Sequence, residues 1–211
     1  KESFNGGPLT IPKNIKDPAA YEFCYQPTLW PKIDEFKKTW ETYYAAMEDL
    51  AKRIMAAFAE ALGLESSYFD RFISNPISAL RALHYPTTTD AIIEKQQRAG
   101  AHTDYGSLTI LLPQVGTTGL QIKKKNSWID VPALEDCLII NIGDLMELWT
   151  AGRWVSTLHR VIARPNQPPR KSLAYFHQPD WDSIINPINS NNYESVVSGP
   201  YLMDKFKSTN L

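Results

Sequence analysis

The chain has 211 residues, 43% hydrophobic and 21% charged, which is enough for one domain with a sizeable core. Its formal net charge of −1 offers no basic field for a nucleic acid polymer or an anionic membrane. No apolar run approaches the roughly 18 residues of a membrane-spanning helix. The two cysteines, Cys24 and Cys137, lack metal-type spacing and do not support a disulfide. We therefore expect a reduced, cytoplasmic setting, with any targeting signal hidden in a missing N-terminus.

Residues 1–30 predict an irregular arm, because glycines and prolines interrupt every period. Residues 31–74 predict supporting helices. Apolar residues recur at steps of three and four from Ile33 to Leu62, which is typical of an amphipathic helix of about eight turns. Pro31 suits its first turn and Gly63 its C-cap. A shorter helix is expected over Ser66–Phe72.

Residues 77–178 predict the core of a sandwich or jelly roll, because short apolar runs alternate there with Gly, Pro, Asn and Asp. The expected strands are Ser78–Tyr85, Gly100–Asp104, Ser107–Leu112, Gly119–Lys123, Trp128–Val131, Leu138–Ile142, Ser156–Ala163 and Ser172–Phe176. A turn or helix is expected near 145–150, and 91–99 is ambiguous. The tail, 179–211, is Asn- and Ser-rich, with a final helical turn expected at Tyr201–Phe206.

A candidate metal site comes from His102, Asp104 and His159. Residues two apart on a strand point to one face, so His102 and Asp104 can aim an imidazole and a carboxylate at one point. His159 lies among strand formers further on. Two histidines and one carboxylate, with other positions open, are the ligand set of non-haem Fe(II) oxygenases. The alternative is a satisfied polar pair at a strand end.

A candidate carboxylate-binding site comes from Arg170 and Ser172, which are also two apart. A guanidinium and a hydroxyl match a carboxylate, which takes paired charge-assisted hydrogen bonds. Tyr85, at the end of an earlier strand, offers a second hydroxyl. The alternative is a surface arginine beside a proline-rich turn. His84 and His177 have no carboxylate two positions away, so we expect structural roles for both.

Four runs of the sequence closely resemble the isopenicillin N synthase-like family of Fe(II)- and 2-oxoglutarate-dependent dioxygenases. They are His102-Thr103-Asp104-Tyr105-Gly106-Ser107-Leu108-Thr109, Asn141-Ile142-Gly143-Asp144, Ser156-Thr157-Leu158-His159-Arg160-Val161 and Arg170-Lys171-Ser172. The resemblance is firm over about residues 78–180. It implies a mainly β fold with supporting α, namely a double-stranded β-helix (a distorted jelly roll) braced by a long helix.

The resemblance also implies an activity. His102, Asp104 and His159 match the iron ligands of the family. Arg170, Ser172 and Tyr85 match the residues that hold the distal carboxylate of the 2-oxoglutarate cosubstrate. With O2, such an enzyme hydroxylates or otherwise oxidises a C–H bond of a small organic molecule and converts 2-oxoglutarate to succinate.

The sequence departs from the family at its start, because members begin with further strands. We therefore expect the chain to lack an N-terminal portion. Two alternatives stay open: an oxidase like isopenicillin N synthase itself, whose Arg-x-Ser pair grips the substrate, and a non-catalytic binding domain. We expect a small-molecule substrate, no nucleic acid or membrane partner, and a monomer or weak dimer. The segments 21–30 and 91–98 and the tail near Trp181 are expected to line the mouth of the site.

Overall fold

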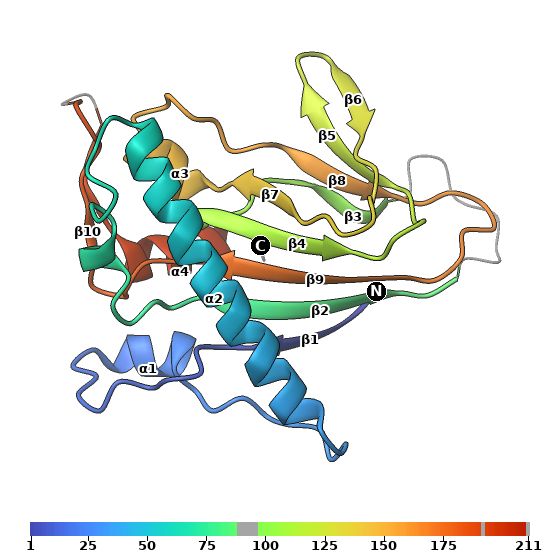
Figure 1. Ribbon diagram of the computed structural model, residues 1–211, viewed down its shortest axis with the longest axis horizontal. Helices are drawn as coiled ribbons and strands as arrows, with labels where there is room; N and C mark the ends of the chain where they lie inside the picture. Colours follow the sequence, from blue (N-terminus) through green and yellow to red (C-terminus); the bar gives the residue numbers. More distant parts are fainter. Residues whose placement is uncertain (88–96, 191–192, 210–211) are drawn as a thin grey trace.

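Two antiparallel sheets form the centre of the computed structural model, which describes residues 1–87, 97–190 and 193–209 (Figure 1). The five-stranded sheet has the order β1 (Glu2–Gly6), β2 (Ala79–Tyr85), β9 (Arg170–His177), β4 (Leu108–Pro113) and β7 (Ile139–Ile142). The four-stranded sheet has the order β3 (Gln97–His102), β8 (His159–Ile162), β5 (Leu120–Lys124) and β6 (Ser127–Asp130). The predicted jelly roll is confirmed.

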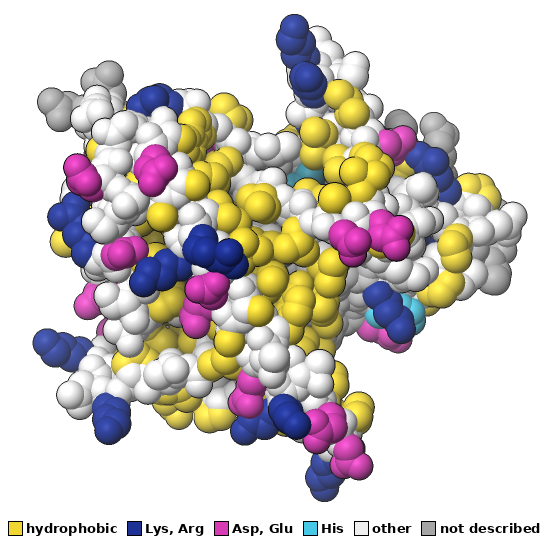
Figure 2. Space-filling view, in the orientation of Figure 1, with side chains coloured by type: hydrophobic (Ala, Val, Ile, Leu, Met, Phe, Trp, Pro, Cys, Tyr) yellow, Lys and Arg dark blue, Asp and Glu magenta, His cyan; other side chains and the backbone are white. Residues whose placement is uncertain are grey.

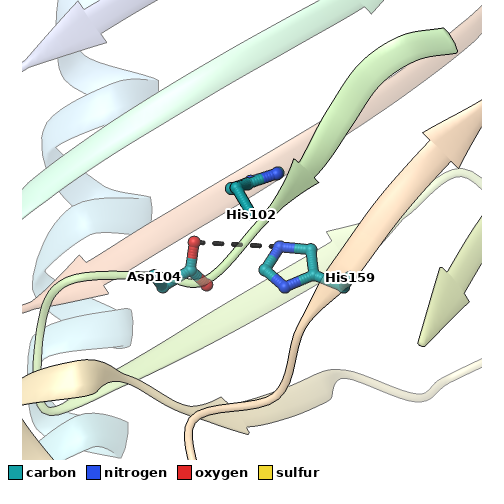
Figure 3. Close-up of side chains that lie close together, drawn as sticks. All are labelled: His102, Asp104 and His159. Atoms are coloured by element: carbon teal, nitrogen blue, oxygen red, sulfur yellow. Dashed lines mark ion pairs between the residues drawn. The ribbon is translucent and has the colours of Figure 1, made fainter. Parts of the chain in front are cut away.

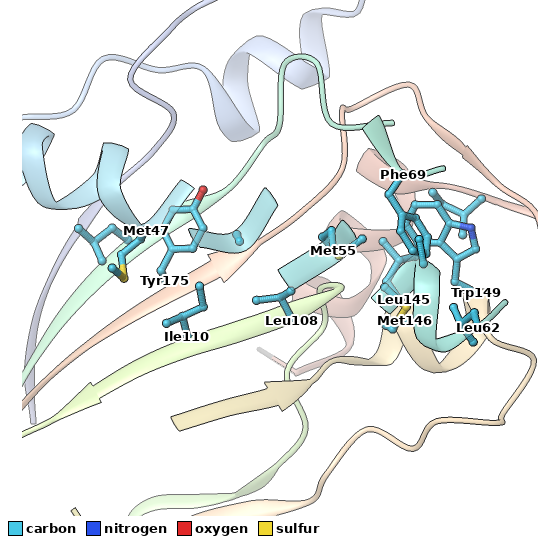
Figure 4. Close-up of a cluster of buried hydrophobic side chains, with 14 of the residues drawn as sticks. Met47, Met55, Leu62, Phe69, Leu108, Ile110, Leu145, Met146, Trp149 and Tyr175 are labelled. Atoms are coloured by element: carbon cyan, nitrogen blue, oxygen red, sulfur yellow. The ribbon is translucent and has the colours of Figure 1, made fainter. Parts of the chain in front are cut away.

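The long helix α2 (Phe36–Ala61) crosses the outer face of the five-stranded sheet (Figure 1). Its apolar stripe enters the main core, in which Met47 of the helix lies near Tyr175 of β9 (Figure 4). The Tyr44 ring meets the Tyr175 ring at 5.2 Å between centroids. The Tyr44 hydroxyl also donates a 3.0 Å hydrogen bond to the Ser78 carbonyl. The predicted brace is therefore present, and the helix fixes β9, which carries Arg170 and Ser172.

The two ends of α2 differ in how well the sequence predicts them. The helix begins at Phe36 and not in the turn of Pro31, because Glu35 adopts a left-handed conformation (φ 60°) that interrupts it. Ile33 is consequently 63% exposed. The C-terminal end is as predicted. Gly63 has φ +75°, and the amides of Gly63 and Leu64 donate to the carbonyls of Glu60 and Ala59, which is a Schellman motif.

Several buried aromatic side chains pack where α2 ends. The ring of Trp149, from α3 (Asp144–Trp149), contacts Phe69 and Phe72 edge-on, and Met55 and Leu62 lie in the same cluster (Figure 4). The helix predicted over 66–72 is shorter in the structure. Only the 3-10 turn η1 (Asp70–Phe72) forms, because the preceding residues make successive tight turns.

The first 30 residues are more ordered than the irregular arm that we predicted. β1 pairs with β2 from Glu2↔His84 to Gly6↔Leu80. Pro18–Cys24 forms the helix α1, which Asp17 caps by accepting from the Ala19 amide. These elements are too short to show a period in the sequence, and their partners lie far along the chain.

The C-terminal part adds the short strands β10 (Ile184–Ile185) and β11 (Val196–Val197) and the helix α4 (Ser198–Thr209), which extends beyond the predicted turn. Trp181 is only 7% exposed and packs with Ala20, Tyr25, Ile77 and Leu202 in a second core cluster. The expectation that Trp181 lines the mouth is therefore wrong. Residues 91–96, which we expected to line the mouth, lie outside the described residues. Among the described helices, none is both long and apolar enough to cross a membrane.

An apolar surface lies beside α2, over β4, β9 and β2 (Figure 2). It holds a hollow of about 620 Å³, whose walls include Phe4, Ala82, Leu112 and Leu173. Of the six predicted site residues, only Ser172 also lines this hollow. Arg170 and the three predicted metal ligands line a different cavity, between the two sheets.

Candidate active site

The two predicted histidine ligands are direct cross-strand partners. His102 is the last residue of β3 and His159 the first of β8, and the two pair in the sheet register. Their ring centroids are 4.3 Å apart. β-pairing thus brings together two residues that are far apart in the sequence, with both imidazoles on one face (Figure 3).

Both imidazoles are held with one nitrogen free. Nδ1 of His102 lies 2.7 Å from the Gly100 carbonyl oxygen, and Nδ1 of His159 lies 2.9 Å from that of Thr157. A carbonyl only accepts, so in each ring Nδ1 carries the proton and Nε2 keeps its lone pair. Burial lowers the pKa of His102, which the hydrogen bond to Gly100 only partly opposes. The net lowering of the His102 pKa favours the neutral, metal-binding form of its ring.

Asp104 joins the pair from a turn, which corrects the predicted strand over 100–104. β3 ends at His102, and the chain bends before Asp104. Oδ1 of Asp104 lies 3.8 Å from Nε2 of His159 (Figure 3). One ligand atom from each of His102, Asp104 and His159 lies within 4.8 Å of the others, a separation that one bound ion spans.

The second oxygen of the Asp104 carboxylate is held by two neighbours. Oδ2 accepts a 2.7 Å hydrogen bond from the Thr109 hydroxyl and a 2.8 Å bond from the Asn141 side-chain amide. Thr109 and Asn141 are themselves cross-strand partners in β4 and β7. Asp104 is 7% exposed, so these bonds compensate its burial and leave Oδ1 for a metal.

Two glycines let the turn that carries Asp104 pack against the start of α3. A Cβ on Gly143 would clash with the Gly106 backbone, and one on Gly106 would clash with the His177 carbonyl. The close approach allows the Asp144 amide to donate a 2.7 Å bond to the Asp104 carbonyl. The Asp144 carboxylate accepts from Thr103 and from Lys205 of α4. The turn is thus fixed by backbone contacts that side chains would block.

The predicted carboxylate site lies on neighbouring strands of the other sheet. Tyr85 of β2 and Arg170 of β9 are cross-strand partners, both 3% exposed, with the guanidinium carbon 5.4 Å from the phenol centroid. Burial lowers the pKa of Arg170 and raises that of Tyr85. Among the described residues, no carboxylate pairs with Arg170, and the buried Oγ of Ser172 has no hydrogen-bond partner. A buried guanidinium without a carboxylate partner and a buried hydroxyl without a hydrogen-bond partner are suited to binding an anion from outside the chain.

One cavity, of about 120 Å³, contains both groups. His102, Asp104 and His159 line it together with Arg170, Ser172 and Tyr85. The remaining walls are mostly apolar. They include Leu111, Leu120, Ile122, Val131 and Val161. The six residues singled out in the sequence therefore converge on one space between the two sheets.

The sequence gives no role to Thr109 and Asn141, although both lie in the quoted runs. Their role follows from the pairing of β4 with β7, which brings the two side chains together and cannot be predicted from either segment alone.

Of the described residues in 21–30, none lines the cavity, so that part of the predicted mouth is wrong. His84 and His177 have the structural roles expected. His84 bonds Glu2 at 2.8 Å, and the buried Nδ1 of His177 lies 2.6 Å from the Ser107 hydroxyl.

Comparison with known proteins decides the family. Residues 76–179 match the model of the 2OG-Fe(II) oxygenase superfamily. The crystal structure of a full-length Neurospora crassa protein in complex with alpha-KG and 5-formyluracil aligns with a TM-score of 0.85 and 32% identity. That alignment covers 98% of this chain and 68% of the Neurospora chain. The chain belongs to the 2OG-Fe(II) oxygenase superfamily.

Relatives of this oxygenase chain extend beyond its length. It is 34% identical over 188 residues to the 2-oxoglutarate-dependent dioxygenase thnC of Trichoderma harzianum, covering 87% of this chain and 58% of thnC. It is 32% identical over 157 residues to 1-aminocyclopropane-1-carboxylate oxidase 1 of Cucumis melo, covering 73% of this chain and 49% of the oxidase. The chain thus spans less than two thirds of either relative. The superfamily uses Fe(II), 2-oxoglutarate and O2, as its name states.

Proposed function

We propose that this chain carries the catalytic site of an Fe(II)- and 2-oxoglutarate-dependent dioxygenase. The enzyme hydroxylates or otherwise oxidises a C–H bond of a small organic molecule. One observation carries the proposal, namely that a single cavity holds two kinds of group. Two imidazoles and a carboxylate lie at one end of it. A buried guanidinium lies at the other end, and among the described residues it has no acidic partner. Membership of the superfamily supports the same assignment.

The donor set suits Fe(II). His102 and His159 offer Nε2 lone pairs, and Asp104 offers Oδ1. These three ligands would bind one side of the ion and leave its other positions open for cosubstrate and O2. Thr109 and Asn141 act through Asp104, because they hold its second oxygen away from the metal position.

The other end suits 2-oxoglutarate. Arg170 would bind the distal carboxylate through charge-assisted hydrogen bonds, and the hydroxyls of Ser172 and Tyr85 would complete the contact. The orientation points the 2-oxo acid end of the molecule toward the histidines. The apolar lining keeps water away from the reacting atoms.

Iron, when bound, would supply O2 activation, coupled to the conversion of 2-oxoglutarate to succinate and CO2. The residues of the chain supply ligand geometry, orientation and dryness. The hydrogen bonds that orient both imidazoles and the Asp104 carboxylate keep the donor set in place before substrate arrives.

An oxidase without 2-oxoglutarate is the second candidate, because a relative at 32% identity is named 1-aminocyclopropane-1-carboxylate oxidase. In that case Arg170 and Ser172 would bind the substrate's own carboxylate. The two candidates differ in one product, since only the dioxygenase releases succinate.

The test is 2-oxoglutarate conversion by protein loaded with Fe(II) in air. We expect succinate from the unmodified protein, even without substrate at a slow uncoupled rate. His159→Ala should abolish succinate formation and weaken Fe(II) binding. The matched control is His84→Ala, whose exposed ring pairs with Glu2 outside the cavity and whose loss should change neither quantity. Fe(II) binding and succinate formation that survive His159→Ala would refute the assignment.

The remaining expectations concern the setting. We keep the cytoplasmic location as a proposal, supported by Cys24 and Cys137 both being unpaired. We also keep a small-molecule substrate and a monomer or weak dimer. The Neurospora crassa relative has been crystallised with alpha-KG and thymine, so a small planar heterocycle is one substrate class to test first.

A further inference from the structure

The helix α4 contacts the turn that carries Asp104 at two places. At the first, the Phe206 ring meets the Tyr105 ring edge-on, with 5.3 Å between their centroids. The hydroxyls of Thr209 and Tyr105 are also hydrogen-bonded to each other. Tyr105 directly follows Asp104 in the chain, so α4 holds the turn on the C-terminal side of this predicted metal ligand.

The second contact is an ion pair that acts on the other side of the same ligand. Nζ of Lys205 lies 2.8 Å from Oδ2 of Asp144, the first residue of α3. The same oxygen accepts a 3.2 Å hydrogen bond from the Thr103 hydroxyl. Thr103 lies between His102 and Asp104 in the sequence, so the ion pair reaches the backbone that joins two of the three predicted ligands.

Asp144 holds the same segment through its backbone. Its amide donates a 2.7 Å hydrogen bond to the Asp104 carbonyl, so one residue binds the turn at both Thr103 and Asp104. The Asp144 side chain is only 13% exposed, and among the described residues Lys205 alone forms an ion pair with it. A buried carboxylate is costly without a charged partner. The lysine therefore keeps Asp144 in place, and Asp144 keeps Asp104 in place.

One face of α4 supplies the polar contacts. Tyr201, Lys205 and Thr209 are four residues apart and so lie on the same side of the helix. Nζ of Lys205 lies 5.5 Å from the centroid of the Tyr201 ring, a cation–π contact. Leu202 and Phe206, on the neighbouring face, pack in the second core cluster. The cluster thus anchors the helix and directs its polar face toward the turn.

We propose that Lys205 is a positioning residue for the iron site, that it acts through Asp144, and that docking of α4 is coupled to metal binding. The inference rests on the proposed function, because it concerns the ligand Asp104. Lys205 does not line the cavity, so it would act without touching the metal. Coupling of this kind is reciprocal: if docked α4 strengthens metal binding, bound metal strengthens the docking of α4 by the same factor.

The first experiment is anaerobic titration with Co(II), whose visible spectrum reports both affinity and ligand geometry. Lys205→Met removes the charge and keeps the length of the side chain. It should weaken Co(II) binding by about tenfold and change the visible bands of the bound ion. Lys205→Arg keeps a cation beside Asp144 and should retain most of the affinity. The matched control is Lys207→Met, because Lys207 lies on the same helix and its ion pair with Asp204, at 3.9 Å, is exposed.

Asp144→Asn tests whether Lys205 acts through Asp144. Asparagine keeps the backbone amide and an oxygen for Thr103, but it has no charge for the lysine to hold. Lys205→Met should therefore have no further effect on Co(II) affinity in the Asp144→Asn protein. Additive losses would overturn the proposed path. A purely structural role would lower the free energy of unfolding in urea and leave the Co(II) spectrum of the folded protein unchanged.

Hydrogen exchange tests the coupling in the unmodified protein, without any substitution. Co(II) should slow exchange of the α4 amides by up to about tenfold, the reciprocal of the expected loss of affinity. The same addition should slow exchange less in Lys205→Met. Equal exchange of α4 with and without Co(II) would show that the helix and the metal site are independent.

Binding of Co(II) to the unmodified protein distinguishes the possible failures. Unmodified protein that binds no Co(II) would defeat the proposed function itself. If Co(II) binds, the role of Lys205 is wrong when Lys205→Met matches Lys207→Met in affinity and spectrum, or when Lys205→Arg loses as much affinity as Lys205→Met.

Discussion

The Thr109 hydroxyl lies 2.7 Å from Oδ2 of Asp104 and donates a hydrogen bond to it. The bond reaches across the turn between β3 and β4, from a buried residue to the one ligand that does not lie on a strand. It therefore sets which carboxylate oxygen faces His159. The orientation of Asp104 depends on β4 and not on its own segment.

Thr109→Val tests this dependence, because valine keeps the shape of threonine and removes the hydroxyl. We expect Fe(II) or Co(II) affinity to fall by about 10- to 100-fold, since Asp104 loses half of its orienting bonds. Anaerobic titration with Co(II), followed by its visible spectrum, measures the change. Thr117→Val is the control, because the exposed Thr117 hydroxyl bonds only the Gln114 carbonyl. Equal affinities in both variants would show that Asn141 alone holds the carboxylate.

Gly143→Ala should destabilise the protein by about 2 kcal/mol or more, because the new Cβ meets the Gly106 backbone. Metal affinity should fall with it, since the displaced turn carries Asp104. Urea unfolding gives the free energy of unfolding. Gly100→Ala is the matched control, as a Cβ there meets nothing nearer than 4.0 Å. A Gly143→Ala protein as stable as the control would mean that the two turns can separate freely.

His177 should make the protein less stable in mild acid. Burial lowers its pKa from 6.5 to about 4, so between these values the unfolded chain binds more protons than the folded one. The stabilisation is complete above pH 6.5 and is lost as the pH falls toward 4, by up to about 3 kcal/mol. His177→Gln should remove this slope.

The measurement is urea unfolding of both proteins across that pH range. Asp180 acts in the opposite direction, because burial raises its pKa to about 6 and the folded chain then binds the extra proton. Its contribution cancels in the difference between the unmodified protein and His177→Gln. Parallel pH profiles for the two proteins would show that His177 does not titrate on unfolding.

The two cysteines should differ sharply in reactivity. Burial raises the pKa of Cys24 to about 12, whereas Cys137 is exposed. A thiol reagent at neutral pH should therefore modify one cysteine in the folded protein and both after unfolding. Mass spectrometry identifies the modified residue. Rapid labelling of Cys24 in the folded state would indicate that the α1 region opens easily.

Much of the scaffold was predictable from local pattern. The apolar steps of α2 and the strand runs around Leu108–Pro113 and Ile139–Ile142 are strong signals that tertiary contacts reinforce. The six site residues came from spacing and from family resemblance, and they meet in one cavity. Residues two apart do share a face in β9, where Arg170 and Ser172 lie.

The remainder depends on contacts between distant segments. Asp104 leaves the strand because the Asp144 amide and the Gly106–Gly143 approach bend the chain, and neither is visible in the local sequence. Thr109 and Asn141 meet only through the β4–β7 register. The contacts of the residues around the metal ligands thus depend on strand register, and a local sequence motif does not specify that register.

The most direct test of the central claim is 2-oxoglutarate binding to the anaerobic Fe(II) protein and to its Arg170→Ala variant. We expect saturable binding to the unmodified protein, with one charge-transfer complex per iron. Arg170→Ala should weaken it by about two orders of magnitude, because two charge-assisted hydrogen bonds to a buried carboxylate are lost together. Arg170→Lys should recover only part of this loss. Iron-loaded protein that binds no 2-oxoglutarate, or product formed without succinate, would contradict the account in favour of the oxidase.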